Sequence, residues 1–248
     1  MNAAISTAVT AAFPICKSWT FMAAKDLFGS RKPRNPKAER AARPLRQPAP
    51  RILLVCEGEK TEPIYFSDLV VAWGLSNQVK IGKNDGSSPD RIVARAEELF
   101  ALAQREGDAF DEVFCVFDRD AHERFGDAVA RLKALKASGQ PLSGVVSVPC
   151  FEFWLLLHFG YTDKPYACKG KKSVGTVVVS DLKKKPGFEK YDKGMAGVFN
   201  VLLPKLEPAL KHAKQLAANP AEHAEHPNPS TQVHLLVNRL KSMANGAS

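Results

Sequence analysis

Arg51-Ile-Leu-Leu-Val-Cys-Glu-Gly58 decides the fold, because this short apolar run ends abruptly on an acid and a glycine. Two later stretches repeat the pattern, Val113-Phe-Cys-Val-Phe-Asp-Arg-Asp120 and Val145-Val-Ser-Val-Pro-Cys-Phe-Glu152. Short apolar, β-branched runs that alternate with helical patterns are typical of buried parallel strands. We therefore expect a parallel sheet whose carboxyl edge carries several acidic side chains.

Helical patterns fill the spaces between these runs. Strands are expected at residues 51–56, 78–81, 112–117 and 144–148, with helices at 61–75, 89–106, 123–138 and 151–159. This alternation indicates an α/β fold with a Rossmann-like parallel sheet flanked by helices. A C-terminal helical extension is expected at 195–218, followed by a last helix that Ser230 caps and that continues through Leu240.

Charge divides the chain into a tail and a nearly neutral body. Of the net charge of +9, residues 1–51 contribute +8, from ten Lys/Arg against Asp26 and Glu39. We interpret residues 1–50 as a disordered basic tail, residues 51–160 as the α/β core, and residues 161–248 as a Lys-rich insert and helices that complete the same domain. A tail of this charge suits a nucleic acid, and a solubilising tail is the alternative.

Neither a membrane span nor a disulfide framework is expected. No run reaches the roughly 18–20 apolar residues that cross a bilayer, and residues 1–21 lack the pattern of a signal peptide. Met22 begins a more ordinary protein start, so the preceding residues are interpreted as an upstream extension. The five cysteines contain no CxxC pair, and three of them lie in or just beyond expected core strands. A reduced, cytoplasmic setting follows.

The acids at the expected strand ends suggest a metal site. Glu57 ends the first strand, and the alternate residues Asp118 and Asp120 end the third, so both aspartates face one side of an extended chain. Glu152 opens an apolar helix, where an unpaired acid is costly. Such carboxylates repel one another unless a hard cation such as Mg²⁺ lies between them.

Other charged residues near these motifs have simpler explanations. Glu59 and Glu62 suit the first turn of a helix that Thr61 caps. His158 is at most a residue that contacts the metal ligands and does not itself bind the metal. The lysines after Gly160 either bind a phosphate backbone or are merely solvated. The candidates for nucleic-acid binding are Lys169, Lys171, Lys172, Lys183, Lys184 and Lys185.

The motifs together resemble the RloB-type family. The resemblance rests on Cys56 to Pro63, Phe117 to Asp120, Pro149 to Phe159 and Asn228 to Val233, and it extends from about Arg51 to Leu240. It implies a Toprim-like fold and a role in bacterial restriction or abortive-infection loci, commonly beside an ABC-type ATPase. It also implies Glu57 as the general acid/base or metal-binding glutamate, Asp118 and Asp120 as the metal-binding pair, and Glu62 as an additional acid. Glu62 follows Glu57 by five residues, whereas in OLD-type nucleases the corresponding acid follows the first by four.

From these features we expect a Mg²⁺- or Mn²⁺-dependent nuclease in anti-phage defence, with catalytic Glu57, Asp118 and Asp120, and with Glu62 and Glu152 completing a second metal site. Two alternatives stay open. One is a non-catalytic nucleic-acid-binding or regulatory subunit. The other is nucleotidyl or phosphoryl transfer on the same scaffold, although no nucleotide-binding loop is visible in the sequence.

Overall fold

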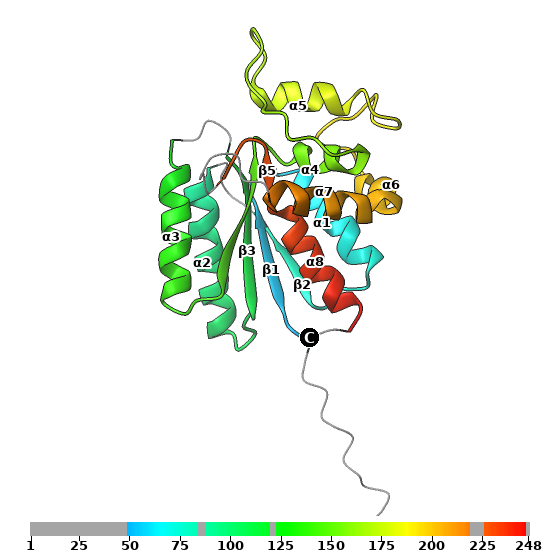
Figure 1. Ribbon diagram of the computed structural model, residues 1–248. Helices are drawn as coiled ribbons and strands as arrows, with labels where there is room; N and C mark the ends of the chain where they lie inside the picture. Colours follow the sequence, from blue (N-terminus) through cyan, green and yellow to red (C-terminus); the bar gives the residue numbers. More distant parts are fainter. Residues whose placement is uncertain (1–48, 84–87, 120–122, 219–225, 247–248) are drawn as a thin grey trace, which may run out of the picture. The chain divides into compact units, whose positions relative to one another are not determined.

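A five-stranded sheet forms the centre of the molecule (Figure 1). The computed structural model describes residues 49–83, 88–119, 123–218 and 226–246. The strands, in chain order, are β1 (Ile52–Cys56), β2 (Val79–Gly82), β3 (Glu112–Asp118), β4 (Leu142–Val148) and β5 (Ser230–Thr231). Their order in the sheet is β2-β1-β3-β4-β5, and only β5 pairs antiparallel to its neighbour. The predicted α/β fold with a mostly parallel sheet flanked by helices is therefore confirmed.

Strand β1 is buried on both faces, as its unbroken apolar sequence predicts. Ile52, Leu54 and Cys56 belong to the hydrophobic core on one face, while Leu53 and Val55 belong to the core on the other. All five residues are at most 1% exposed. This burial fixes the strand, so the residue that follows it is delivered to a defined place at the carboxyl edge of the sheet.

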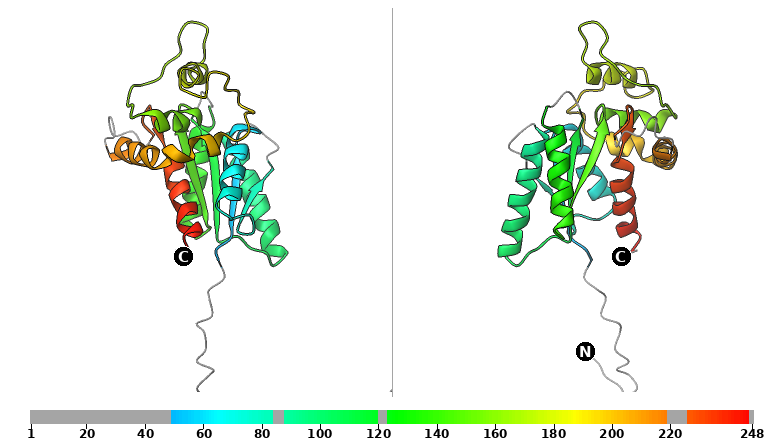
Figure 2. Two further views of the ribbon diagram at one scale, coloured as in Figure 1. Left: turned by 90° about the vertical axis from the view of Figure 1, so that its right-hand side faces the viewer. Right: turned by 60° about the vertical axis from the view of Figure 1, so that its left-hand side comes forward.

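Helices cover both faces of the sheet (Figures 1 and 2). In chain order they are α1 (Thr61–Ala72), α2 (Pro89–Arg105), α3 (Phe125–Ala137), α4 (Glu152–Leu156), the 3₁₀ turn η1 (Leu157–Phe159), α5 (Val174–Leu182), α6 (Val198–Leu202), the 3₁₀ turn η2 (Leu203–Lys205), α7 (Leu206–Ala218) and α8 (Val233–Ala244). Helices α2 and α3 cover one face, and α1 and α8 cover the other. Helix α5 lies beyond the carboxyl ends of the strands.

Three local expectations were wrong. Lys60, not Thr61, is the N-cap of α1, because the Thr61 hydroxyl instead donates to the Lys193 carbonyl at 2.9 Å. The single helix expected at 195–218 is three elements, which begin after Gly197 and contain Pro204, a residue without the N–H that an α-helix needs. Ser230 lies in β5 rather than at a helix start, and Gln232 is the N-cap of α8.

Other expectations concern the termini and the cysteines. Residues 1–48, and with them nearly all of the basic tail, lie outside the described residues. None of the helices in the described part of the chain combines the length and apolar character needed to cross a membrane. The four cysteines that the structure describes are all free thiols, and Cys56, Cys115 and Cys150 are buried as predicted.

Candidate metal centre

Glu57 and Asp118 meet at the carboxyl edge of two adjacent parallel strands. Glu57 follows β1 directly, and its backbone N–H donates to the Val116 carbonyl of β3 at 2.8 Å. Asp118 is the last residue of β3, and its backbone N–H donates to Oε2 of Glu57 at 2.9 Å. The predicted approach of these two acids is therefore present, and it follows from the parallel pairing of β1 with β3.

Glu62 joins the two strand-end acids from the first turn of α1. Its side chain is only 5% exposed, and its carboxylate lies against the backbone of Gly58. A Cβ atom at position 58 would lie 2.1 Å from Oε2 of Glu62, closer than any real contact. The glycine after the strand-end glutamate is therefore required for close packing of the Glu62 carboxylate.

Glu152 contributes the fourth acid from the first residue of α4. It is 1% exposed, and it is not unpaired: the Tyr191 hydroxyl donates to its Oε1 at 3.4 Å, and the Lys193 ammonium lies 3.7 Å from the same atom. A hydrogen bond from Nε1 of Trp154 to the Tyr65 hydroxyl, 2.9 Å long, links α4 to α1. This buried bond fixes the two helices that carry Glu152 and Glu62 relative to each other.

The electrostatics of the cluster show that its carboxylates repel one another. Burial raises the pKa of Glu62 to about 7, and the nearby charge of Glu152 adds to this effect. A hydrogen bond to the backbone opposes part of the increase. Burial raises the pKa of Asp118 well above its usual value, and the charges of Glu62, Glu152 and Glu57 add to the effect. Raised pKa values of this kind arise where several acids share one poorly solvated site.

The lysine beside the cluster responds in the opposite direction. Chiefly the Glu152 carboxylate raises the pKa of Lys193, with smaller contributions from Cys150, Asp118 and Glu62. The ammonium therefore stays charged and offsets part of the negative charge of the cluster.

The residues present fit a hard divalent cation by the chemistry of their donor atoms. Glu57, Glu62, Asp118 and Glu152 offer carboxylate oxygens, the ligands that Mg²⁺ prefers, and their mutual repulsion is what a cation would relieve. In their present rotamers, however, no three His, Cys, Asp or Glu side chains among the described residues stand in a metal-binding arrangement. Side-chain rotation would have to accompany binding.

The other residues considered at this site do not join the acidic cluster in the described structure. Asp120 lies outside the described residues. Arg119 points away from the acids, since its guanidinium lies 5.8 Å from the ring centroid of Phe125. His158 is 3% exposed, and burial lowers its pKa to about 4. Its Nδ1 lies 3.1 Å from the Trp154 carbonyl, so it packs within the core rather than beside the acids.

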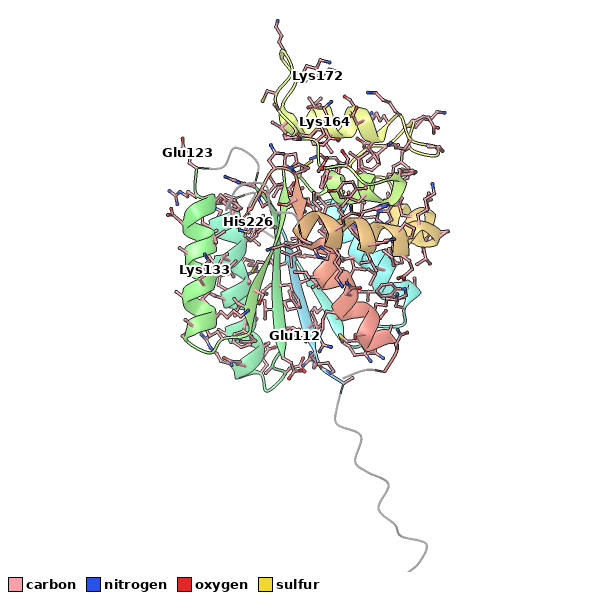
Figure 3. The ribbon with its side chains drawn as sticks, in the orientation of Figure 1. Glu112, Glu123, Lys133, Lys164, Lys172 and His226 are labelled. Atoms are coloured by element: carbon pink, nitrogen blue, oxygen red, sulfur yellow. The ribbon has the colours of Figure 1, made fainter. Side chains whose placement is uncertain are left out.

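The lysines predicted to bind nucleic acid lie in different parts of the structure. Lys183 lines a cavity that it shares with Asp118. Lys184 pairs with Asp181 at 2.7 Å, and Lys185 follows α5 in the turn after it. Lys169 and Lys172 pair through an isolated β-bridge around Lys171, and Figure 3 shows Lys172 on a loop that extends away from the sheet.

Sequence reasoning missed Tyr191 and the specific role of Lys193. In the sequence Lys193 is only one member of a basic stretch, and Tyr191 belongs to no motif. Both approach Glu152 because the segment after α5 folds back onto the acidic edge: Phe188 and Tyr191 are buried, and the Gly197 N–H donates to Asp68 of α1 at 3.0 Å. Only these long-range contacts identify them.

The family model described as RloB-like protein matches residues 52–240. Comparisons with curated proteins and with solved structures gave no match. The matched range begins with β1 and ends within α8, so it contains all four acids of the cluster and the segment that carries Tyr191 and Lys193.

Proposed function

The chain belongs to the RloB-like family, and we propose that it is a metal-dependent nuclease that hydrolyses phosphodiesters at the cluster of Glu57, Glu62, Asp118 and Glu152. The observation that carries the proposal is the meeting of Glu57 and Asp118 across β1 and β3, with two further buried acids beside them. Structural ion pairs do not explain why four carboxylates share one poorly solvated place, whereas acids that hold a cation for phosphoryl chemistry do explain it.

Each acid has a role in this proposal. Glu57, Asp118 and Asp120 are the catalytic group that holds Mg²⁺ or Mn²⁺, and Glu62 and Glu152 complete a second position. Bound there, the cation would neutralise the phosphate and lower the pKa of a water molecule. The protein itself fixes the acids through buried strands and the link between Tyr65 and Trp154, and it limits the access of water to Glu62 and Glu152.

The wider setting rests on the family resemblance. A Toprim-like fold, a cytoplasmic role in anti-phage defence and an ABC-type ATPase partner all belong to the proposal. The basic tail and the lysines between Lys164 and Lys193 would supply the contacts to the nucleic-acid backbone.

A second candidate function is a non-catalytic nucleic-acid-binding or regulatory subunit. The observation that favours it is the Lys193 ammonium 3.7 Å from Glu152, because an internal cation already offsets part of the charge of the cluster. A subunit of this kind would keep the fold and the basic surfaces and would cut no strand.

Cleavage assays separate the two candidates. Purified protein, alone and with the ATPase encoded beside it, is incubated with DNA and with RNA in Mg²⁺, in Mn²⁺ and in EDTA. Metal-dependent products that disappear in Glu57→Gln and Asp118→Asn, and persist in the exposed control Glu59→Gln, support the nuclease. Binding without products under all these conditions supports the subunit.

A further inference from the structure

The segment from residue 160 to residue 197, here called the cover, forms one wall of the space in front of Asp118. It contains α5, and Figure 2 shows it beyond the carboxyl ends of the strands. The cover is fixed in place rather than a loose arm, because Val178, Leu182 and Phe188 are fully buried. The hydrogen bond from Thr61 to the Lys193 carbonyl ties it to α1.

Further bonds hold the opposite end of the cover. The Asn228 side chain accepts from the Tyr166 N–H at 3.2 Å and donates to the Tyr166 carbonyl at 2.8 Å. The Tyr166 hydroxyl in turn donates to Asp181 of α5 at 3.4 Å. The space below α5 is therefore bounded on both sides by anchored chain.

A cavity of about 260 Å³ lies between the cover and the acidic edge. Two lysines line it, Lys183 and Lys193, together with Ser173 and Thr176, and Asp118 and Asp192 are also in its wall. Positive and negative side chains in one lining suit a phosphate group that binds together with a cation. The lysines would contact the phosphate oxygens, and the carboxylates would hold the cation beside those oxygens.

The size of the cavity restricts what can reach Asp118. Sites for small molecules usually measure about 300–1,000 Å³, so a cavity of about 260 Å³ takes a group no larger than a nucleotide. A base pair contains two nucleotides, so a cavity of this size does not take an intact pair. A nucleotide that enters a pocket as a whole must first leave the stack of the duplex, which costs unpairing energy that a single strand does not pay.

We infer that this cavity receives one nucleotide of a single strand, with its phosphate between Lys183 and Lys193, and that the protein selects single-stranded over duplex nucleic acid. The inference rests on the proposed function for the position of the reacting phosphate. Lys193 binds the phosphate directly in this inference, since it lines the cavity while its ammonium lies 3.7 Å from Glu152.

Binding measured without cleavage tests the inference. Full-length protein in EDTA, and again in Ca²⁺, is titrated into a fluorescein-labelled oligonucleotide, either as a single strand or annealed to its complement, and fluorescence anisotropy is recorded. DNA and RNA versions are both used. Lys183→Ala and Lys193→Ala are compared with Lys190→Ala, an exposed lysine outside the cavity lining.

We expect Lys183→Ala and Lys193→Ala each to weaken single-strand binding about three- to ten-fold, and to change duplex binding less than about two-fold. Lys190→Ala should change both about equally and weakly. Lys193→Arg, which keeps the charge beside Glu152, should restore most of the affinity, and thermal melting shows whether each variant is folded.

Equal losses on single strand and duplex, or losses no larger than those of Lys190→Ala, overturn the inference. Because the readout is binding, the two proposals fail separately. Cleavage without a preference for single strands would overturn the single-strand inference and support the nuclease proposal. A lysine-dependent preference for single strands without cleavage would overturn the nuclease proposal and support the single-strand inference.

Discussion

The backbone N–H of Asp118 donates to the Glu57 carboxylate across 2.9 Å, so the ends of β1 and β3 are joined through an acidic side chain. In the metal-free protein this bond fixes the position of the Glu57 carboxylate beside Asp118. It also means that Oε2 of Glu57 is already engaged by the backbone of β3.

Glu57→Gln preserves this bond, because the amide oxygen of glutamine still accepts from the Asp118 N–H. The charge is lost while the geometry stays, so we expect metal-dependent cleavage to fall at least about 100-fold with no loss of folding stability.

Asp118→Asn removes a carboxylate whose pKa is raised by burial and repulsion, so the metal-free protein should unfold at an equal or higher temperature. Calorimetric titration with Mg²⁺ and thermal melting in EDTA measure both effects.

The control is Glu59→Gln, which removes a charge from the same loop at an exposed position. It should leave metal affinity, cleavage and melting temperature unchanged. A loss of activity in Glu59→Gln equal to that in Glu57→Gln would mean that the loop, rather than the individual acid, is what matters.

Glu62 gives the stability of the metal-free protein a specific pH dependence. Its pKa is raised from 4.5 to about 7 in the fold, so the folded state holds the proton more tightly than the unfolded chain does. The wild type therefore loses stability as the pH rises from about 4.5 to about 7 and loses no more from this group above that range. Glu62→Gln removes the penalty, and in EDTA its advantage should grow across this window to the order of 1–3 kcal/mol.

Chemical unfolding of both proteins at several pH values in EDTA measures this difference. Glu59→Gln is again the control and should show no such trend. An advantage of Glu62→Gln that is constant with pH would show that it comes from packing rather than from ionisation.

Gly58→Ala tests the close approach of Glu62 to the backbone. The added Cβ would fall 2.1 Å from Oε2 of Glu62, so the carboxylate must move out of the cluster. Because the atoms in the way are the end of a flexible side chain, we expect a destabilisation of no more than about 1 kcal/mol and a loss of metal affinity. Gly126→Ala is the matched control, because a Cβ there meets nothing within 4 Å.

In Gly58→Ala combined with Glu62→Ala, the clash is absent. The double variant should therefore be more stable than the sum of the two single effects predicts. Strict additivity would place the cost of Gly58→Ala in the backbone and not in its approach to Glu62.

Sequence patterns predicted the elements whose signals are local. The apolar runs of β1, β3 and β4 and the expected start of α2 at residue 89 match the structure closely. The meeting of Glu57 with Asp118 also followed from sequence, because parallel strands deliver their carboxyl ends to one edge. Each of these predictions needs only strand burial and chain direction.

Long-range contacts decided the parts that sequence did not predict. Helix α5 contains the β-branched run Thr176-Val-Val-Val179, which favours a helix only weakly, but Ser173 caps it and burial of Val178 and Leu182 stabilises it. Ser230 pairs with Val148 of β4, a partner 82 residues away, and this pairing overrides its capping tendency. No local pattern could place Lys193 beside Glu152.

The basic tail leads to the last prediction, which depends on charge alone. Residues 1–50 carry nine Lys/Arg and two acids, so deleting them should weaken binding to single strands most strongly at low salt. The dependence of log affinity on log salt should become shallower by about 0.7 for each phosphate that the shortened protein no longer neutralises. The deletion stops before Arg51, which pairs with Asp108. A full-length control with seven tail residues changed to Gln (Arg31, Lys32, Arg34, Lys37, Arg40, Arg43 and Arg46) should reproduce most of the weakening if charge is the cause. Unchanged affinity at low salt in both variants would leave the tail as a solubiliser and assign strand binding to the cover.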